Sequence, residues 1–168
     1  ARYAGVAATR KDLATEEIYF VGMLNWIAEN LDATIEAMQR FTSAADASVD
    51  RIQTARSILI VSLSKRGKTA EAEEVLATYL SSKPTKLTEI ARMNSELAKV
   101  YQKKSDFAKM APHAAEAFKS AKTLLADASS RARGLDEILD TGMLSFEAYR
   151  DLGEQAKADS VLEEMRAL

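Results

Sequence analysis

One turn-and-helix pattern, which recurs along the chain, limits the fold more than any other feature of the sequence. In its clearest copy, residues 67–80 begin as a turn and continue as an amphipathic helix with the apolar face Ala72, Val75, Leu76, Tyr79 and Leu80. The residues before it form another stripe of helical spacing, made of Ile52, Ala55, Ile58, Leu59 and Leu63. Gly67 ends that earlier helix, because glycine adopts the left-handed C-cap conformation without a steric cost. Two helices joined by so short a turn pack antiparallel.

Three further copies of the pattern lie at residues 21–31, 97–110 and 146–158. Each continues into a second apolar stripe, formed in turn by Thr34, Met38 and Phe41, by Ala114, Ala117 and Phe118, and by Leu162 and Met165. We therefore predict an all-α chain of about eight or nine helices in a single domain over residues 1–168. The prediction comprises an N-terminal helix at 1–14 and helix pairs at about 15–44, 48–83, 86–126 and 128–168.

These helix pairs resemble the tetratricopeptide repeat family over about residues 15–168. The signature of that family places a large and a small residue in the first helix, then an aromatic residue, small residues in the second helix and a closing proline. The matching residues are Leu97, Ala98, Tyr101, Phe107, Ala114 and Ala117 in one pair, and Ala72, Leu76 and Pro84 in the pair before it. Four residues depart from the signature: Thr34, Ile60, Met110 and Phe146. The resemblance implies a divergent, right-handed α-solenoid of about four repeats.

The turns of the four copies also repeat at related distances. Glu29, Gly67, Ser105 and Gly153 hold equivalent places, and the steps between them are 38, 38 and 48 residues. The family repeat has about 34 residues. The excesses are close to one, one and four whole turns of a helix with about 3.6 residues per turn. Helices lengthened by whole turns keep the same face towards their neighbours.

The largest insertion falls between Ser120 and Gly134. Either the second helix of the third pair runs long, or the next helix starts early, capped by Asp127 or Ser129. We favour the early start, with Gly134 as a weak point inside a long helix. Pro112 lies several residues into its helix, where it removes a backbone hydrogen bond, so we expect a kink there or a helix that begins near Ala111.

A solenoid offers a concave groove lined by the first helix of each pair, in which a partner helix or peptide fits. By the resemblance, four rows of residues face that groove: Glu16, Tyr19, Met23 and Trp26; Thr54, Ser57, Val61 and Ser64; Arg92, Ser95, Lys99 and Gln102; and Asp140, Met143, Glu147 and Arg150. The candidate partner-binding residues among them are Tyr19, Met23, Trp26, Arg92, Lys99, Gln102, Glu147 and Arg150. Trp26 has two interpretations, an exposed anchor or a packed core residue. Tyr79 and Tyr101 are expected in the core.

The composition argues against catalysis and against nucleic-acid binding. The formal net charge is -2, and basic and acidic residues are mixed along the whole length, which gives no continuous basic face. Because the chain has one histidine, His113, and no cysteine, it cannot supply a zinc, di-iron or thiol site. No phosphate-binding loop or nucleophile elbow appears. No apolar run reaches the roughly 20 residues that cross a bilayer. We expect no catalytic residue, metal, cofactor or membrane span.

The sequence therefore predicts a soluble, non-catalytic module that binds a protein or peptide in a concave groove. The alternative is a structural or dimerising accessory domain of a larger bacterial protein, such as a thioredoxin-like thiol-disulfide oxidoreductase. In that case the partner is a second copy of the chain or another domain of the same protein. The missing initiator methionine favours a piece of a larger chain and leaves the cellular compartment open.

Overall fold

The computed structural model describes residues 13–168, and in this part of the chain it contains eight α-helices and no strand. The all-α prediction is confirmed. The helix expected at residues 1–14 lies outside the described residues, apart from its last two positions. The helices are α2 (Thr15–Ile27), α3 (Leu31–Thr42), α4 (Val49–Lys65), α5 (Thr69–Ser81), α6 (Leu87–Lys103), α7 (Phe107–Ala126), α8 (Arg131–Asp151) and α9 (Gln155–Arg166).

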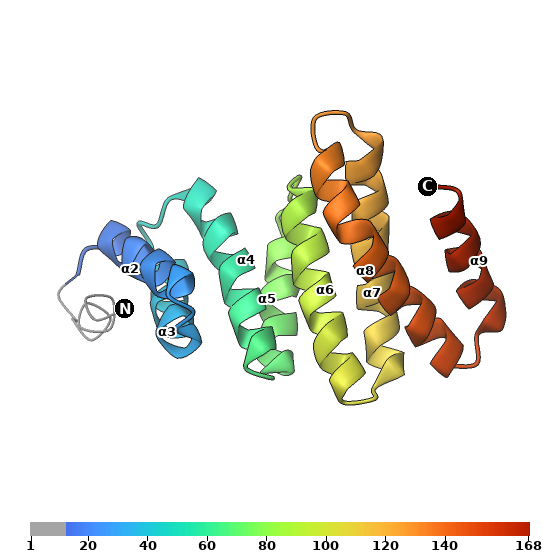
Figure 1. The fold of residues 1–168 in the computed structure, drawn as a ribbon. Helices are drawn as coiled ribbons and strands as arrows, with labels where there is room; N and C mark the ends of the chain where they lie inside the picture. Colours follow the sequence, from blue (N-terminus) through green and yellow to red (C-terminus); the bar gives the residue numbers. More distant parts are fainter. Residues whose placement is uncertain (1–12) are drawn as a thin grey trace. The chain divides into compact units, whose positions relative to one another are not determined.

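The chain divides into two compact units, with the boundary between Pro84 and Thr85. Unit 1 contains α2–α5 and unit 2 contains α6–α9. Within each unit every helix contacts the next one along the chain, and α6 also contacts α8. In unit 2, α6 and α8 lie on one side with α7 behind them (Figure 1).

Four turns of the same geometry join the helices of each pair. Their central residues, Glu29, Gly67, Ser105 and Gly153, all have positive φ, at 56°, 74°, 54° and 74°. At each turn this residue donates its N–H to the carbonyl three residues back, and the following N–H donates to the carbonyl five residues before it, over distances of 2.8 to 3.1 Å. These two bonds define the Schellman motif. The residues on which the sequence pattern was aligned are thus the ones in the left-handed conformation.

The two turns without glycine keep this geometry against a steric penalty. A residue with a Cβ in the left-handed region costs about 1–2 kcal/mol relative to the right-handed one. Glu29 and Ser105 carry that penalty, whereas Gly67 and Gly153 do not. The residue after each turn is already the N-cap of the next helix. Of these N-caps, Asp106 accepts a hydrogen bond from the Lys109 N–H at 3.2 Å.

In unit 1, helix α4 is buried on almost every side. Every residue of α4 from Ser57 to Ser64 is buried, and α2, α3 and α5 all contact this helix. A helix that is buried all round is typical of the centre of a core. Around it pack Met38, Phe41 and Tyr79, which are completely buried. Tyr79 is therefore a core residue, as the sequence predicted.

In unit 2, small buried residues let the helices approach one another closely. Completely buried alanines stand on all four helices: Ala91, Ala98, Ala114, Ala117, Ala121, Ala148 and Ala158. Phe118, Ile138 and Val161 form an apolar cluster between α7, α8 and α9. Tyr101 is 2% exposed, which agrees with its prediction as a core residue.

The long insertion is shared between two helices. α7 has 20 residues where α5 has 13, and α8 has 21 where α6 has 17. The early start of α8 that we favoured is present, but α7 takes the larger part. The predicted caps are wrong, because the N-cap of α8 is Ser130. α7 starts at Phe107, so the alternative start near Ala111 is also wrong.

Gly134 is a packing residue and not only a weak point in the helix. It is buried, and a Cβ built on it would lie 2.4 Å from the backbone nitrogen of Leu125 at the end of α7. The missing side chain is what allows α8 to cross the end of α7 so closely.

Candidate interaction surfaces

The most exposed row of large apolar side chains in unit 2 runs along α8. Leu135, Leu139 and Met143 are 56%, 64% and 51% exposed, and they follow one another at steps of four residues. This spacing places them on one face of the helix, over a length of about 12 Å at about 1.5 Å per residue. The buried face of α8 carries Ile138, Leu144 and Ala148 instead. We call Leu135, Leu139 and Met143 the α8 stripe.

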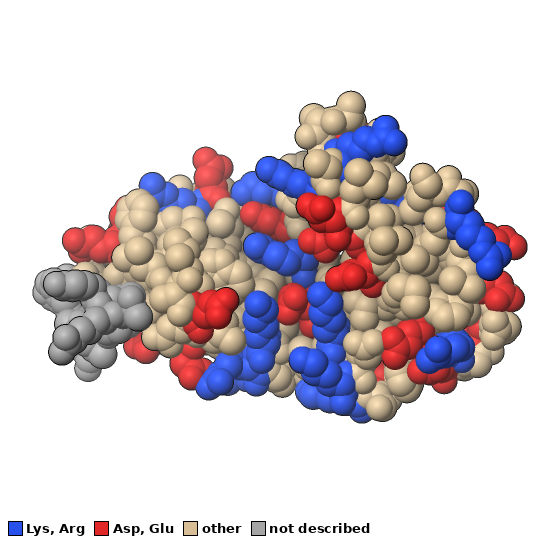
Figure 2. All heavy atoms as spheres, viewed as in Figure 1, with Lys and Arg blue, Asp and Glu red and all other residues tan. Residues whose placement is uncertain are grey.

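Acidic side chains border the α8 stripe. Asp136 and Asp140 are exposed, and each follows directly after a leucine of the stripe. Figure 2 shows an uncharged strip along α8 with acidic side chains on the side towards α6. Near the C-terminal end of the same face stands Arg150, whose Nε donates to Asp151 at 2.8 Å. This hydrogen bond raises the pKa of Arg150 and lowers that of Asp151.

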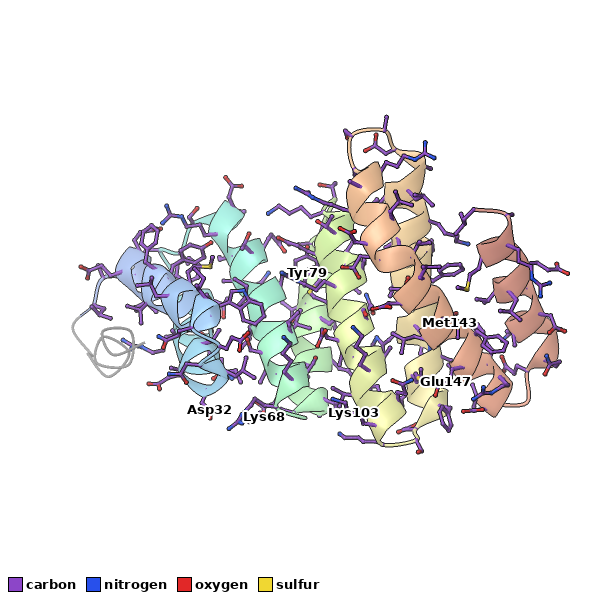
Figure 3. The ribbon with its side chains drawn as sticks, in the orientation of Figure 1. Asp32, Lys68, Tyr79, Lys103, Met143 and Glu147 are labelled. Carbon is purple, nitrogen blue, oxygen red and sulfur yellow. The ribbon has the colours of Figure 1, made fainter. Side chains whose placement is uncertain are left out.

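The structure brings two predicted partner-binding residues together. Gln102 at the end of α6 donates from its Nε2 to Glu147 Oε2 on α8, at 2.5 Å. Glu147 lies one helical turn after Met143 (Figure 3). On α6, Lys99 Nζ lies 3.8 Å from Glu96 Oε1, and Arg92 is half-buried. Of the five predicted residues on α6 and α8, only Gln102 and Glu147 are in contact with each other across the two helices.

Four residues expected to face the groove are buried instead. Ser57, Val61 and Ser64 on α4 are at most 1% exposed, and Ser95 on α6 is 2% exposed. The expectation that these side chains are open to a partner is wrong. The physical reason is that each helix is flanked by others: α2, α3 and α5 contact α4, and α7 and α8 contact α6.

In unit 1, two of the three predicted residues, Tyr19 and Trp26, lie on the side of α2 that faces α4. Tyr19 packs against Phe41, with ring centroids 5.1 Å apart, and the Arg51 guanidinium lies 5.2 Å from the Tyr19 ring. Arg51 also forms an ion pair with Glu16. Tyr19 and Met23 are both half-buried. The contacts of Tyr19 and Glu16 join α2 to α3 and α4.

Trp26 combines both interpretations that the sequence allowed. It is half-buried, and Lys65 Nζ on α4 lies 5.6 Å from its ring. The ring also lines an open cavity of about 390 Å³ together with Ile27, Glu29, Leu31 and Lys65. The half-buried indole therefore borders a cavity large enough for a side chain of a partner.

No protein-family model and no curated protein matches this chain. An all-α fold alone is compatible with many functions, so the function has to be argued from the surfaces. None of the helices in the described part is both long enough and apolar enough to cross a membrane.

His113 contacts two side chains of the neighbouring helix α6. Its Nδ1 lies 2.9 Å from Asn94 Oδ1, and its ring stacks on Tyr101 with the centroids 5.9 Å apart. Asn94 donates its own amide to the Ile90 carbonyl, which leaves its oxygen to accept from His113. Across residues 13–168, no group of three or more His, Cys, Asp or Glu is placed to hold a metal ion.

The sequence interpretation missed Leu135 and Leu139. The signal was present, because helix 131–151 carries a second apolar row beside its buried one, and one row would be enough to pack a helix. Counting back from the turn residue shows how α8 differs in exposure from α4 and α6. Ten residues before the turn stand Ser57, Ser95 and Met143, of which the serines are buried and Met143 is exposed.

Proposed function

We propose that this chain is a non-catalytic protein-binding module, built from tetratricopeptide-like helix pairs in a solenoid. The observation that carries the proposal is the α8 stripe, in which Leu135, Leu139 and Met143 are all more than half exposed. An exposed apolar patch with a charged rim is typical of a surface that binds another protein. The repeated turn geometry supports the solenoid, because equal turns give equal helix pairs.

The stripe suits a small, reversible interface. It is about 12 Å long, so it buries less area than the roughly 1,200–2,000 Å² of a standard stable interface unless neighbouring residues take part. Asp136 and Asp140 beside the stripe and Arg150 beyond its C-terminal end extend the surface with polar side chains. We expect a transient complex in which a few apolar side chains give most of the affinity.

Site-specific photo-crosslinking tests this proposal. A photoreactive residue replaces Met143 in the full chain, and a matched control places the same residue at Glu163, which is exposed on α9. We expect a partner that crosslinks through position 143 and not through 163. The purified partner must then bind the unmodified chain and must bind the Leu139→Ala variant about tenfold more weakly. A partner that binds both proteins equally would contradict the proposal.

The alternative function is a structural or dimerising accessory domain of a larger protein. The α8 stripe also favours this alternative, because the same stripe on a second copy of the chain would offer it an apolar surface. Sedimentation equilibrium separates the two functions. A dimer of the full chain that dissociates on Leu139→Ala would favour the accessory domain, whereas a monomer at all concentrations favours a module for a different partner.

A further inference from the structure

A cavity of about 240 Å³ opens between α7, α8 and α9 in unit 2. Its walls include apolar and aromatic side chains from all three helices: Ala115, Phe118, Tyr149 and Val161. Ser145 on α8 is the most deeply buried of the residues that line the cavity, at 1% exposed. A concave site with apolar walls and a few polar groups is the usual form of a site for a small molecule.

The hydroxyl group of Ser145 has no hydrogen-bond partner among residues 13–168. A buried hydroxyl without a partner destabilises the folded chain, and such groups are uncommon in proteins. Ser62, Ser95 and Ser120 are also buried and unpaired, but they do not line this cavity. Of the four serines, Ser145 alone borders the cavity, and a molecule bound there is a source of the missing partner.

The charged side chains that line the cavity are already paired. Lys122 on α7 forms an ion pair with Glu164 on α9, and Lys157 Nζ lies 2.7 Å from Glu154 Oε2. The ammonium group of Lys122 also lies 4.8 Å from the centre of the Phe118 ring. A charged ligand would therefore lose its hydration in the cavity without gaining a free counter-ion. The lining favours an uncharged ligand.

The volume of the cavity suits a single substituted ring. An apolar cavity of about 150 Å³ takes up one benzene molecule, and drug-sized ligands occupy roughly 300–1,000 Å³. At about 240 Å³ this cavity lies between the two. Phe118 and Tyr149 favour an aromatic ring, because offset and edge-to-face ring contacts add attraction beyond the burial of apolar area.

We propose that this cavity binds one small, uncharged aromatic molecule of the phenol class. The ring of the ligand rests against Phe118, Tyr149 and Val161, and its hydroxyl group forms a hydrogen bond with Ser145. The residues of the α8 stripe do not line the cavity. The site therefore goes beyond the proposed function, and either of the two can fail while the other stands.

NMR titration of the full, nitrogen-15-labelled chain with p-cresol tests the proposal. We expect the amide signals of Ser145 and Val161 to shift with a Kd of about 1 mM, as befits a ligand with so few atoms. Two charged relatives, para-hydroxybenzoate and para-hydroxybenzylamine, should bind at least about tenfold more weakly than p-cresol. Toluene, which has the same ring and methyl group without the hydroxyl, is the reference for the hydrogen bond.

Two variants of the chain complete the test. Ser145→Ala should lower the affinity for p-cresol relative to toluene by about fivefold, because it removes the partner of the ligand hydroxyl. Ser120→Ala is the matched control, since it removes a hydroxyl that is also buried and unpaired but does not line the cavity, and it should leave this ratio unchanged. Circular dichroism verifies that the helices of both variants are intact, and the ligand series with the native chain needs no variant.

Four results would overturn the proposal. The first is the absence of shifts at Ser145 and Val161 at p-cresol concentrations up to about 10 mM. The second is a ratio of p-cresol to toluene affinity that Ser145→Ala leaves unchanged. Tighter binding of para-hydroxybenzoate than of p-cresol would assign the cavity to an anion. Tighter binding of N-acetyltyrosinamide than of p-cresol would assign it to a tyrosine side chain of a partner protein.

Discussion

Replacing Gly134 by alanine should destabilise unit 2, because the added methyl group meets backbone atoms that cannot move aside. Its Cβ would lie 2.4 Å from Leu125 N, 2.7 Å from Leu125 Cα and 2.9 Å from Leu124 C. Real Cβ atoms essentially never show contacts under 3.0 Å, so the end of α7 must shift by at least about 0.6 Å. Such overpacking costs about 1–3 kcal/mol.

Part of this cost is offset by the helix itself. Alanine is favoured over glycine inside a helix by about 0.5–1 kcal/mol. The net loss of unfolding free energy for Gly134→Ala is therefore about 1–2 kcal/mol. At Gly142 on the same helix, the three atoms nearest to an added Cβ all belong to the Met165 side chain, with Sδ at 2.7 Å. Methionine has three rotatable bonds and yields easily, so Gly142→Ala should be neutral or stabilising by up to about 0.5 kcal/mol.

Urea denaturation followed by circular dichroism measures both variants. Hydrogen exchange at the amides of Leu124 and Leu125 then reports whether the end of α7 has loosened. Ala132→Gly is the matched control, since Ala132 is exposed near the same end of α8 and its substitution measures the helix preference without a packing term. The reasoning is refuted if Gly134→Ala is as stable as the native chain, or if Gly142→Ala loses as much stability as Gly134→Ala.

Three further predictions concern the turns, the α6–α8 contact and the α7–α8 connection. Ser105→Gly should stabilise the fold by about 0.5 kcal/mol and Gly153→Ala should destabilise it by about 1 kcal/mol, because both residues have positive φ. If urea denaturation shows changes of the same sign in the unfolding free energy of the two variants, this prediction is wrong. Ser95→Met should lower the unfolding free energy by about 1–3 kcal/mol, because Ser95 is buried and a larger side chain overpacks its site. Met143→Ser, at the equivalent exposed place on α8, should change it by less than about 0.5 kcal/mol. Hydrogen bonds from Ser129 and then Ser130 lower the pKa of Asp127 in the folded chain, so Ser129→Ala should raise that pKa in a carbon-13 NMR titration. Asp127 contributes stability at pH values above the pKa that it has in the unfolded chain, and this contribution is lost as the pH falls through its lower pKa in the folded chain. An Asp127→Asn variant whose unfolding free energy depends on pH as that of the native chain does would contradict this contribution.

Local signals in the sequence were sufficient for the helices and their turns. Gly67 and Gly153 show the left-handed turns directly, and the apolar spacing places Glu29 and Ser105 at the same position although neither is glycine. The match of Tyr79 and Tyr101 to packing places of the repeat signature also identified them as core residues. These features depend on residues close together in the chain, which is why the sequence alone could predict them.

The open surfaces could not be predicted in the same way, because exposure depends on which helix lies next to a residue. Ser57 and Ser95 hold the place that a solenoid opens to its groove, yet both are buried. The length of α7 was also hidden, since no glycine or proline occurs between Ser120 and Gly134 to mark its end. The role of Gly134 required the position of the Leu125 backbone, which no sequence pattern supplies.

The faces of α6 and α8 carry side chains of different size at equivalent positions. The same Schellman turn ends α6 and α8, so the two helices present corresponding residues in corresponding directions. At these places α6 carries Ala91 and Ser95, which are both buried. Where α8 carries Leu139 and Met143, more than half of each side chain remains exposed. The local geometry that ends the two helices is therefore the same, and equivalent positions are buried on α6 and exposed on α8.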